Sequence, residues 1–201
     1  MASGLHLARF RCSSCGDCCR RHAVPLTFAD VNRLERATGL EPPAFIELGS
    51  LDEVDMSGEP SSLILLPQGL RIPFLARVDG ACVFLGSDGL CSVHSARPAA
   101  CRAFPFHATL GRRGGVRRLR VLRDAECSLE LTGPSDLPSI RRHQLELERE
   151  LEEHYARVRE YNRMQKLRRR LGRRLADLRE FFSRKPEARE ASGFSRSCPS
   201  R

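Results

Sequence analysis

The chain has 201 residues, which allows one domain of ordinary size plus an appendage. It has no Trp and only two Tyr, so ten Phe and the leucines must supply most of the core. The formal net charge is +9, but residues 1–140 carry 16 basic and 15 acidic side chains, whereas residues 141–201 carry 18 and 10. The positive excess therefore lies almost entirely in the C-terminal part.

The N-terminal residues lack the apolar core of a secretory signal. The longest apolar segments, residues 63–67 and 82–85, are far too short to span a bilayer. We therefore predict a cytosolic protein without a membrane-spanning segment. Thiols stay reduced in the cytosol, so nine cysteines, an odd number, favour metal binding over a disulfide framework.

Eight of these cysteines precede the C-terminal helical pattern. The first four fall within eight residues, where Gly16 and Asp17 are typical of a turn, so we predict a loop that directs its sulfurs inward. Eight thiols make two sets of four, the number that a tetrahedral zinc or an iron–sulfur cluster takes. The predicted ligands are Cys12, Cys15, Cys18, Cys19, Cys82, Cys91, Cys101 and Cys127. The ninth, Cys198, is expected to be an exposed thiol with no role.

Helices are predicted next. After an extended segment over residues 20–26, Thr27 and Asp30 have the spacing of a capping box, and Gly39 follows the last apolar residue of the helix. A second short helix is predicted from Pro43 to Gly49, because proline is favoured at a first helical position.

The spacing of the apolar residues then changes to the alternation typical of strands. Residues 50–61 are polar and indicate a surface loop, and strands are predicted over residues 62–66, 70–78 and 81–85. Cys82 then lies on a strand, and Cys91 just beyond a turn. One helical turn beginning at Pro98 is expected to carry Cys101. A hairpin with its turn at residues 111–115 and a strand over 116–122 leads to Cys127.

Pro134 and Pro138 mark a boundary. From Ser139 to Phe182, apolar residues recur in steps of three and four with Asn162 as a polar break, which predicts a long amphipathic helix. The predicted segments are a metal-binding domain at 1–138, this charged helix at 139–185, and a disordered tail at 186–201. The expected fold class is α+β, a small metal-stapled domain with short helices and a small antiparallel sheet, followed by the long helix.

The spacing leaves the arrangement of ligands open. A C-x2-C-x2-C run with a fourth cysteine from elsewhere is typical of bacterial cubane ferredoxins, which favours iron–sulfur, whereas a closed four-thiolate site suits zinc equally well. We expect Cys18 and Cys19 to point apart, toward two centres or one centre and its surroundings. Alternatively, one four-cysteine centre forms and the other thiols pack as small apolar groups or hold a second, looser site.

Arg97 and Arg102 flank Cys101. Four thiolates around zinc leave a net charge of about −2, which guanidinium groups beside the sulfurs would offset. The alternative is that both are surface residues. Cys91 and His94 form a Cys-x-x-His pair, but histidine ligation is the weaker hypothesis because eight thiols are available.

Three motifs occur in order: the stretch from Phe10 to Cys19, then Cys82-Val83-Phe84-Leu85, then the run from Gly89 to Pro105. Together they resemble the CxxCxxCC (YkgJ-type) family of zinc- or iron-chelating domains over about residues 8–128. The resemblance implies a metal or iron–sulfur site on the eight cysteines, with His94 where the family usually has an aromatic residue. The same cluster occurs in the flagellin lysine methylase, so methyl transfer or redox chemistry is conceivable among relatives.

Two functional hypotheses follow. The first is a protein that holds an iron–sulfur cluster, or a zinc or iron ion, with a redox or electron-transfer role and a redox partner. The second is a zinc-stapled module that binds a protein or nucleic acid, or pairs with itself, through the basic helix. Nucleic acid is the less expected partner because no aromatic stacking set accompanies the arginines. An enzyme would need an open coordination position, for which eight soft ligands give no indication.

Overall fold

The computed structural model describes residues 15–50, 62–111, 115–122 and 137–183, and it confirms the α+β class. The helices are α1 (Asp17–Arg21), α2 (Phe28–Thr38), α3 (Ala99–Ala103), α4 (Leu137–Arg170) and α5 (Leu178–Ser183), with 3-10 turns η1 (Pro42–Ala44) and η4 (His94–Ala96). The strands are β1 (Ile46–Gly49), β2 (Ile64–Leu66), β3 (Gly69–Leu75), β4 (Arg77–Val78), β5 (Ala81–Cys82), β6 (Phe106–Leu110) and β7 (Val116–Val121).

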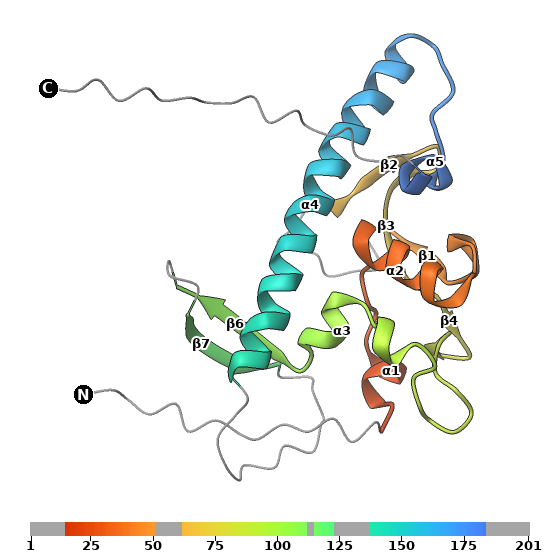
Figure 1. Ribbon diagram of the computed structural model, residues 1–201. Helices are drawn as coiled ribbons and strands as arrows, with labels where there is room; N and C mark the ends of the chain where they lie inside the picture. Colours follow the sequence, from red (N-terminus) through yellow and green to blue (C-terminus); the bar gives the residue numbers. More distant parts are fainter. Residues whose placement is uncertain (1–14, 51–61, 112–114, 123–136, 184–201) are drawn as a thin grey trace, which may run out of the picture.

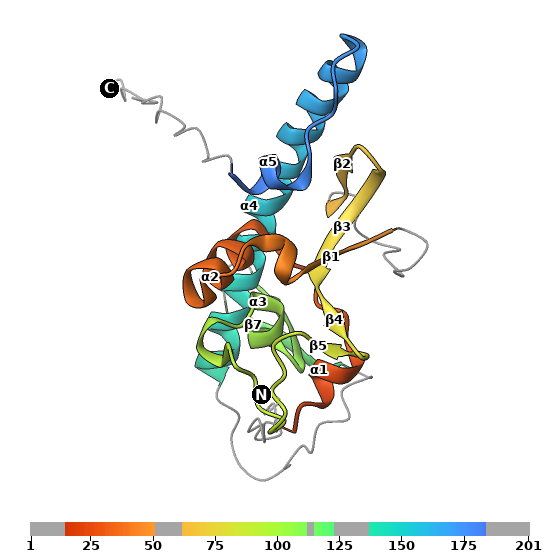
Figure 2. The same cartoon turned by 90° about the vertical axis from the view of Figure 1, so that its right-hand side faces the viewer.

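The strands form three small antiparallel units. In the largest, β3 lies between β1 and β2, while β4 pairs with β5 and β6 pairs with β7. Helix α4 runs along the length of the molecule and packs against α2, α3, β2 and β6 (Figures 1 and 2). It links the three-stranded sheet, through β2, to the β6–β7 pair and to the helices α2 and α3.

The main core lies between α4, α2 and the three-stranded sheet. Val158 and Tyr161 of α4 pack there with Leu34 of α2, and Phe181 of α5 covers one end. Within the described ranges, no helix combines the length and apolar character needed to span a membrane.

Helix α2 begins and ends as its sequence predicts. The Thr27 hydroxyl accepts from the Asp30 backbone N–H at 3.1 Å, and the Asp30 carboxylate accepts from the Thr27 N–H at 3.0 Å. Gly39 ends the helix with φ 69°, a left-handed conformation that favours glycine. Capping chemistry alone is enough to locate this helix.

The predicted second helix from Pro43 to Gly49 is wrong. Only the 3-10 turn η1 forms there, and residues 46–49 are strand β1, which pairs antiparallel with β3 from Ile46 opposite Leu75 to Gly49 opposite Ile72. Tertiary pairing overrides the local helical signal because β3 supplies backbone partners that a short isolated helix would lack. The third strand is also shorter than predicted, since β5 ends at Cys82.

The described part of the first cysteine segment, residues 15–19, is not wholly the loop that the spacing predicts. Cys18 and Cys19 lie in helix α1, which also takes in Arg20 and Arg21 from the segment expected to be extended. Asp17 in the first turn and the two arginines in the last suit the helix dipole. Gly16, at φ 73°, supplies the left-handed turn into the helix, so the glycine is compatible with a short helix as well as with a loop.

The long helix ends earlier than its apolar pattern predicts. It stops at Arg170, where Gly172 has φ 65° and the Arg173 N–H donates to the Arg168 carbonyl at 2.9 Å, a hydrogen bond typical of a Schellman motif. The chain then turns back and forms α5. This reversal lets Phe181 and Phe182 reach the core, which a straight helix could not achieve.

Candidate metal centre

Helix α1 holds two of the predicted ligands beside the β4–β5 hairpin. The Arg77 guanidinium donates to the His22 carbonyl at 3.1 Å and also to the carbonyls of Arg20 and Gly80. One side chain thus ties the end of α1 to the turn between the two strands. Cys18 and Cys19 are thereby placed next to Cys82 on β5.

Cys91 is positioned by a tight turn. The Gly86 N–H donates to the Leu90 carbonyl at 2.8 Å, and residues 85 and 91 form an antiparallel bridge. A Cβ atom at Gly16 would lie 3.2 Å from the Gly89 carbonyl oxygen, so the glycine lets the start of α1 approach this turn closely. The first cysteine motif and the loop over residues 85–91, called the Cys91 loop below, are therefore packed against each other.

Helix α3 carries Cys101 and is held in place by a hydrogen bond to helix α2. The Ala99 N–H at its first turn donates to the Asp30 carboxylate at 2.8 Å, which links α3 to α2. Pro98 precedes the helix as its cap residue, so the predicted helical turn is confirmed, with its start at Ala99. This hydrogen bond fixes the position of α3, and with it the position of Cys101 relative to the other thiols.

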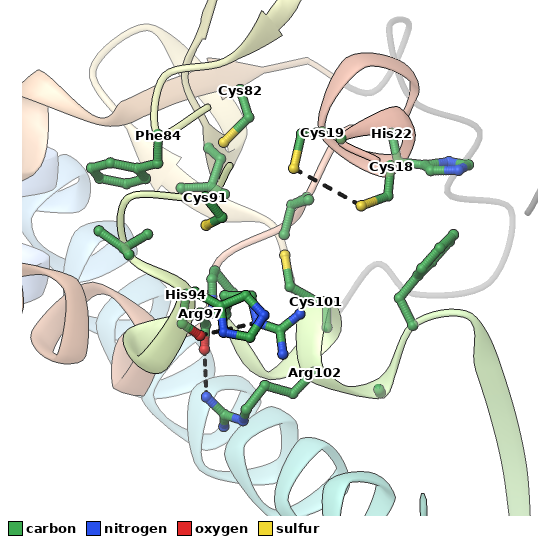
Figure 3. A pocket seen from close by; sticks show the side chains of 18 of the residues that line it. Cys18, Cys19, His22, Cys82, Phe84, Cys91, His94, Arg97, Cys101 and Arg102 are labelled. Atoms are coloured by element: carbon green, nitrogen blue, oxygen red, sulfur yellow. Dashed lines mark hydrogen bonds between the residues drawn. The ribbon is translucent and has the colours of Figure 1, made fainter. Parts of the chain in front are cut away.

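These elements surround one pocket of about 490 Å³. Figure 3 shows the sulfurs of Cys18, Cys19, Cys82, Cys91 and Cys101 around it, contributed by α1, β5, the Cys91 loop and α3. Cys15 also lines the pocket, and all six of these cysteines are free thiols. Cys12, Cys127 and Cys198 lie outside the described residues. Thiols separated by more than 80 residues in the sequence thus share one cavity.

The sulfurs are spread around the pocket. The Cys18 and Cys19 sulfurs are 3.9 Å apart, so the expectation that these neighbours point apart is wrong. On a helix, successive side chains differ by about 100° in direction, which lets adjacent thiols face one cavity. Over the described ranges, no three Cys, His, Asp or Glu side chains lie close enough as they stand to hold one metal ion. The pocket as it stands therefore offers one close pair and dispersed further donors.

The pKa values of the thiols reflect burial and mutual repulsion. Burial is the main cause that raises the pKa of the Cys101 thiol to about 12, and the neighbouring Cys18 and Cys82 thiols raise it further. Burial likewise raises the pKa of Cys82. The hydrogen bond from Cys19 is the main cause that lowers the pKa of Cys18 to about 6, and it raises the pKa of Cys19. The thiols thus disfavour one another's ionisation except where they share a proton.

The two arginines beside Cys101 do different things. The positive charge of Arg97 acts to lower the pKa values of Cys18 and Cys101, although burial keeps that of Cys101 high. This favours the first of the two interpretations, in which a guanidinium beside the sulfurs offsets thiolate charge. Its Nε donates to the His94 carbonyl at 3.0 Å. Arg102 instead lies 3.4 Å from Glu150 and 3.5 Å from Glu146 on α4, and donates to the Arg97 carbonyl.

Histidines also line the pocket: His22, His94 and His143. His22 packs on Phe104 with ring centroids 5.1 Å apart, and burial lowers the pKa of His143. Their sequence positions share no spacing, so nothing in the pattern could have grouped them. Asp30 was predicted as a capping residue, but sequence reasoning missed that it is buried beside Glu150, because residues 120 positions apart leave no local signal.

The donor set fits a thiophilic metal. Several sulfurs that line one pocket from different elements are soft ligands of the kind that zinc and iron–sulfur clusters take. A family model described as "Putative zinc- or iron-chelating domain", CxxCxxCC, matches residues 11–130. No curated protein and no solved structure matches the chain. The match covers all eight of the predicted cysteine ligands and more than half of the chain, and the chain belongs to the CxxCxxCC family of zinc- or iron-chelating domains.

Proposed function

We propose that this protein holds iron as an iron–sulfur cluster on its clustered cysteines and that the centre serves a redox or electron-transfer role. The single observation that supports this most is the convergence of sulfurs from α1, β5, the Cys91 loop and α3 on one pocket (Figure 3). Family membership supports the coarser statement that the domain chelates zinc or iron.

The size of the pocket favours a cluster over a single ion. A volume of about 490 Å³ is much larger than one metal ion needs, and among the described cysteines Cys18 and Cys19 are the one pair whose sulfurs are in contact. Sulfurs spread over several walls suit a cofactor of several atoms, in which each iron takes its own protein ligands. A bound cluster would supply one-electron chemistry, while the chain's residues bind it and keep water away.

Charge in the pocket favours a cation. Burial and the neighbouring thiols raise the pKa values of Cys82 and Cys101, and Cys18 raises that of Cys19, so several thiolates are stable together only when positive charge is added among them. Arg97 supplies part of that charge. The walls beside it include Phe84, Leu85 and Phe106, an apolar setting that strengthens the attraction between thiolates and a metal.

All eight predicted cysteines remain in the proposed ligand set. Leu122 lines the pocket, and Cys127 follows five residues later, a separation that a chain can span over up to about 17 Å. Cys12 precedes Cys15 by three residues, a span of up to about 10 Å.

The proposed division of the chain into residues 1–138, 139–185 and 186–201 also stays a prediction.

A zinc site is the second candidate, and the Cys18–Cys19 distance favours it. With metal–sulfur bonds of about 2.3 Å, two ligands of one tetrahedral ion lie about 3.8 Å apart. The observed 3.9 Å between the two sulfurs matches that edge. In this alternative the metal staples the loops, and the protein acts as an interaction module. The same edge is compatible with two thiolates on one iron of a two-iron cluster.

The test is metal and sulfide analysis of full-length protein purified without air. We expect iron and acid-labile sulfide with broad visible absorption. Colourless protein with stoichiometric zinc would establish the second candidate and refute the iron–sulfur proposal. Protein with neither metal, after growth with both supplied, would refute both.

Variants assign the ligands. Cys101→Ser and Cys82→Ser are expected to lower the metal content at least about tenfold, because each removes a donor from a different wall of the pocket. The matched control is Cys198→Ser, expected to keep the full metal content. Equal metal content in all three variants would show that the metal lies elsewhere.

A further inference from the structure

The C-terminal end of α4 and the turn after it form a basic tip, defined as residues 163–174. This stretch contains seven cations and no acidic residue: Arg163, Lys166, Arg168, Arg169, Arg170, Arg173 and Arg174. In both views the end of α4 projects beyond the sheet and α5, at the opposite end of the molecule from α1 (Figures 1 and 2). The tip is therefore far from the thiol pocket.

Most of this charge is not neutralised by the described part of the chain. Arg168 pairs with Glu180, with nitrogen–oxygen distances of 2.8 and 3.1 Å. None of the other six cations of the tip has a carboxylate within ion-pair distance among the residues that the structure describes. Six like charges held together at an exposed end repel one another, so an anionic surface would relieve that repulsion.

Two leucines accompany the cations. Leu167 is 55% exposed and Leu171 59% exposed, although the helix has an apolar face available for burial. They are four residues apart and so lie on one side of the α4 end, with Arg163 and Arg170 beside them. Cations next to exposed leucines can extend along an apolar surface and keep their charges in water.

The tip is built on a fixed frame. The Gln165 side chain, 1% exposed, donates to the Ala176 carbonyl at 2.7 Å and accepts from the Ala176 N–H at 3.0 Å. The Tyr161 hydroxyl donates to the Asp177 carbonyl at 2.7 Å. These bonds hold the returning chain against α4, so the cations and the two leucines are presented together.

We propose that the basic tip docks this protein on an anionic phospholipid surface. Clusters of Lys and Arg on a helix are attracted to acidic lipids, and the leucines add apolar contact at the headgroup level. A second copy of this chain is disfavoured because the two tips would repel each other. A nucleic acid would use the cations but leaves the exposed leucines unexplained, and the tip has no aromatic side chain on which bases could stack.

The experiment is sedimentation of the full-length protein with phosphatidylcholine vesicles, with and without phosphatidylserine. Binding is expected only with phosphatidylserine and should weaken as salt is raised. R169E/R173E should lower vesicle affinity at least about tenfold. The matched control is R117E/R118E on β7, which makes the same charge change at exposed positions away from the tip and should have a much smaller effect.

A second variant separates lipid from nucleic acid. L167S/L171S should lower affinity for the phosphatidylserine vesicles at least about threefold, because two apolar contacts are lost. The same proteins are titrated against duplex DNA and RNA by fluorescence anisotropy. Tighter binding to either nucleic acid, no effect of the leucine change on vesicles, or equal effects of the two charge variants would each overturn the proposal. Metal content is measured alongside and should not differ among these variants.

Discussion

Two polar regions adjoin helix α3, and their charges are balanced in different ways. In the first, Asp30 and Glu150, 1% and 4% exposed, are paired with Arg33, and Glu150 also lies 3.4 Å from Arg102. In the second, the thiol pocket, burial and the neighbouring thiols raise the pKa of Cys101, and Arg97 is a nearby cation.

The difference separates structural from functional polarity. In the ion-pair network, cations of the chain balance the carboxylates, and no buried side-chain nitrogen or oxygen in the described ranges lacks a hydrogen-bond partner. In the pocket, the acidic groups outnumber the cations that the described chain brings to them. Where the chain itself balances the charges, a mutation should lower the stability of the metal-free protein. Where an added metal balances them, a mutation should lower stability only when the metal is bound.

The largest effect is expected where the network is broken. Glu150→Ala leaves Arg33 and Arg102 without their shared carboxylate in a largely buried setting, so the free energy of unfolding should fall by about 3 kcal/mol or more. Urea denaturation of the metal-free protein measures this.

The control for that variant is Glu153→Ala, one turn further along α4. Its side chain is 68% exposed and only 4.0 Å from Arg149, so the cost should stay below about 0.5 kcal/mol. Similar losses in the two variants would mean that the buried network contributes no more than a surface pair.

A pH dependence should come from His154, which is 3% exposed and accepts from the Phe28 N–H through Nδ1 at 3.2 Å. Burial lowers its pKa to about 4, against the favourable charge of Asp30 and with that of Arg157. As pH falls, His154 therefore binds a proton in the unfolded state before it does so in the folded state. Stability should be fully present above pH 6.5 and decline by up to about 3 kcal/mol as pH falls toward 4.

The variant His154→Asn isolates this contribution, because its oxygen can accept from Phe28 but does not titrate in this range. Glu150 acts in the opposite direction, since burial raises its pKa and the folded protein takes up that proton more readily. The measured quantity is therefore the difference in unfolding free energy between the protein and the variant across pH. A constant difference would contradict the assignment to His154.

The sequence predicted what depends on local chemistry. The capping box at Thr27, the break between the strands predicted over residues 62–66 and 70–78, and the hairpin around residues 111–115 were all predicted because their signals lie within a few residues. Strand β1 was missed because its stability comes from β3, which follows about 20 residues later. The end of α4 was missed because Gly172 interrupts an apolar repeat that continues beyond it.

For the candidate site, composition identified the cysteines and not their environment. The compound motif was enough to assign the family, which the family model confirms. The 3.9 Å contact between Cys18 and Cys19 depends on α1 being helical, which spacing alone did not indicate. Asp30 and Glu150 were not foreseen as a pair, since nothing local connects residues on α2 and α4.

Asp30→Asn tests whether the ion-pair network supports the thiol pocket, because it should affect both stability and metal binding. The carboxylate accepts from the Thr27 N–H, from Arg33 and from the Ala99 N–H, and an amide in its place turns a donor toward other donors. We expect a loss of about 2 kcal/mol in unfolding free energy and weaker metal retention, since α3 holds Cys101. Asp177→Asn is the control, because Asp177 caps α5 away from the pocket. It should cost about 1 kcal/mol or less and keep the metal. Equal metal retention in both variants would show that the network does not support the pocket.

Apart from the controls, the smallest effect is expected at Cys101 in the metal-free protein, and this variant tests the comparison most directly. Cys101→Ser exchanges one small side chain for another, and no nitrogen or oxygen of the described chain uses the sulfur as a hydrogen-bond partner. Without metal, the unfolding free energy should change by less than about 1 kcal/mol. With metal, the variant should lose most of the stabilisation that binding confers, because binding and folding are coupled at such sites. A loss in the metal-free protein as large as that of Glu150→Ala would mean that the thiols are ordinary packing groups. The distinction between the two regions would then disappear.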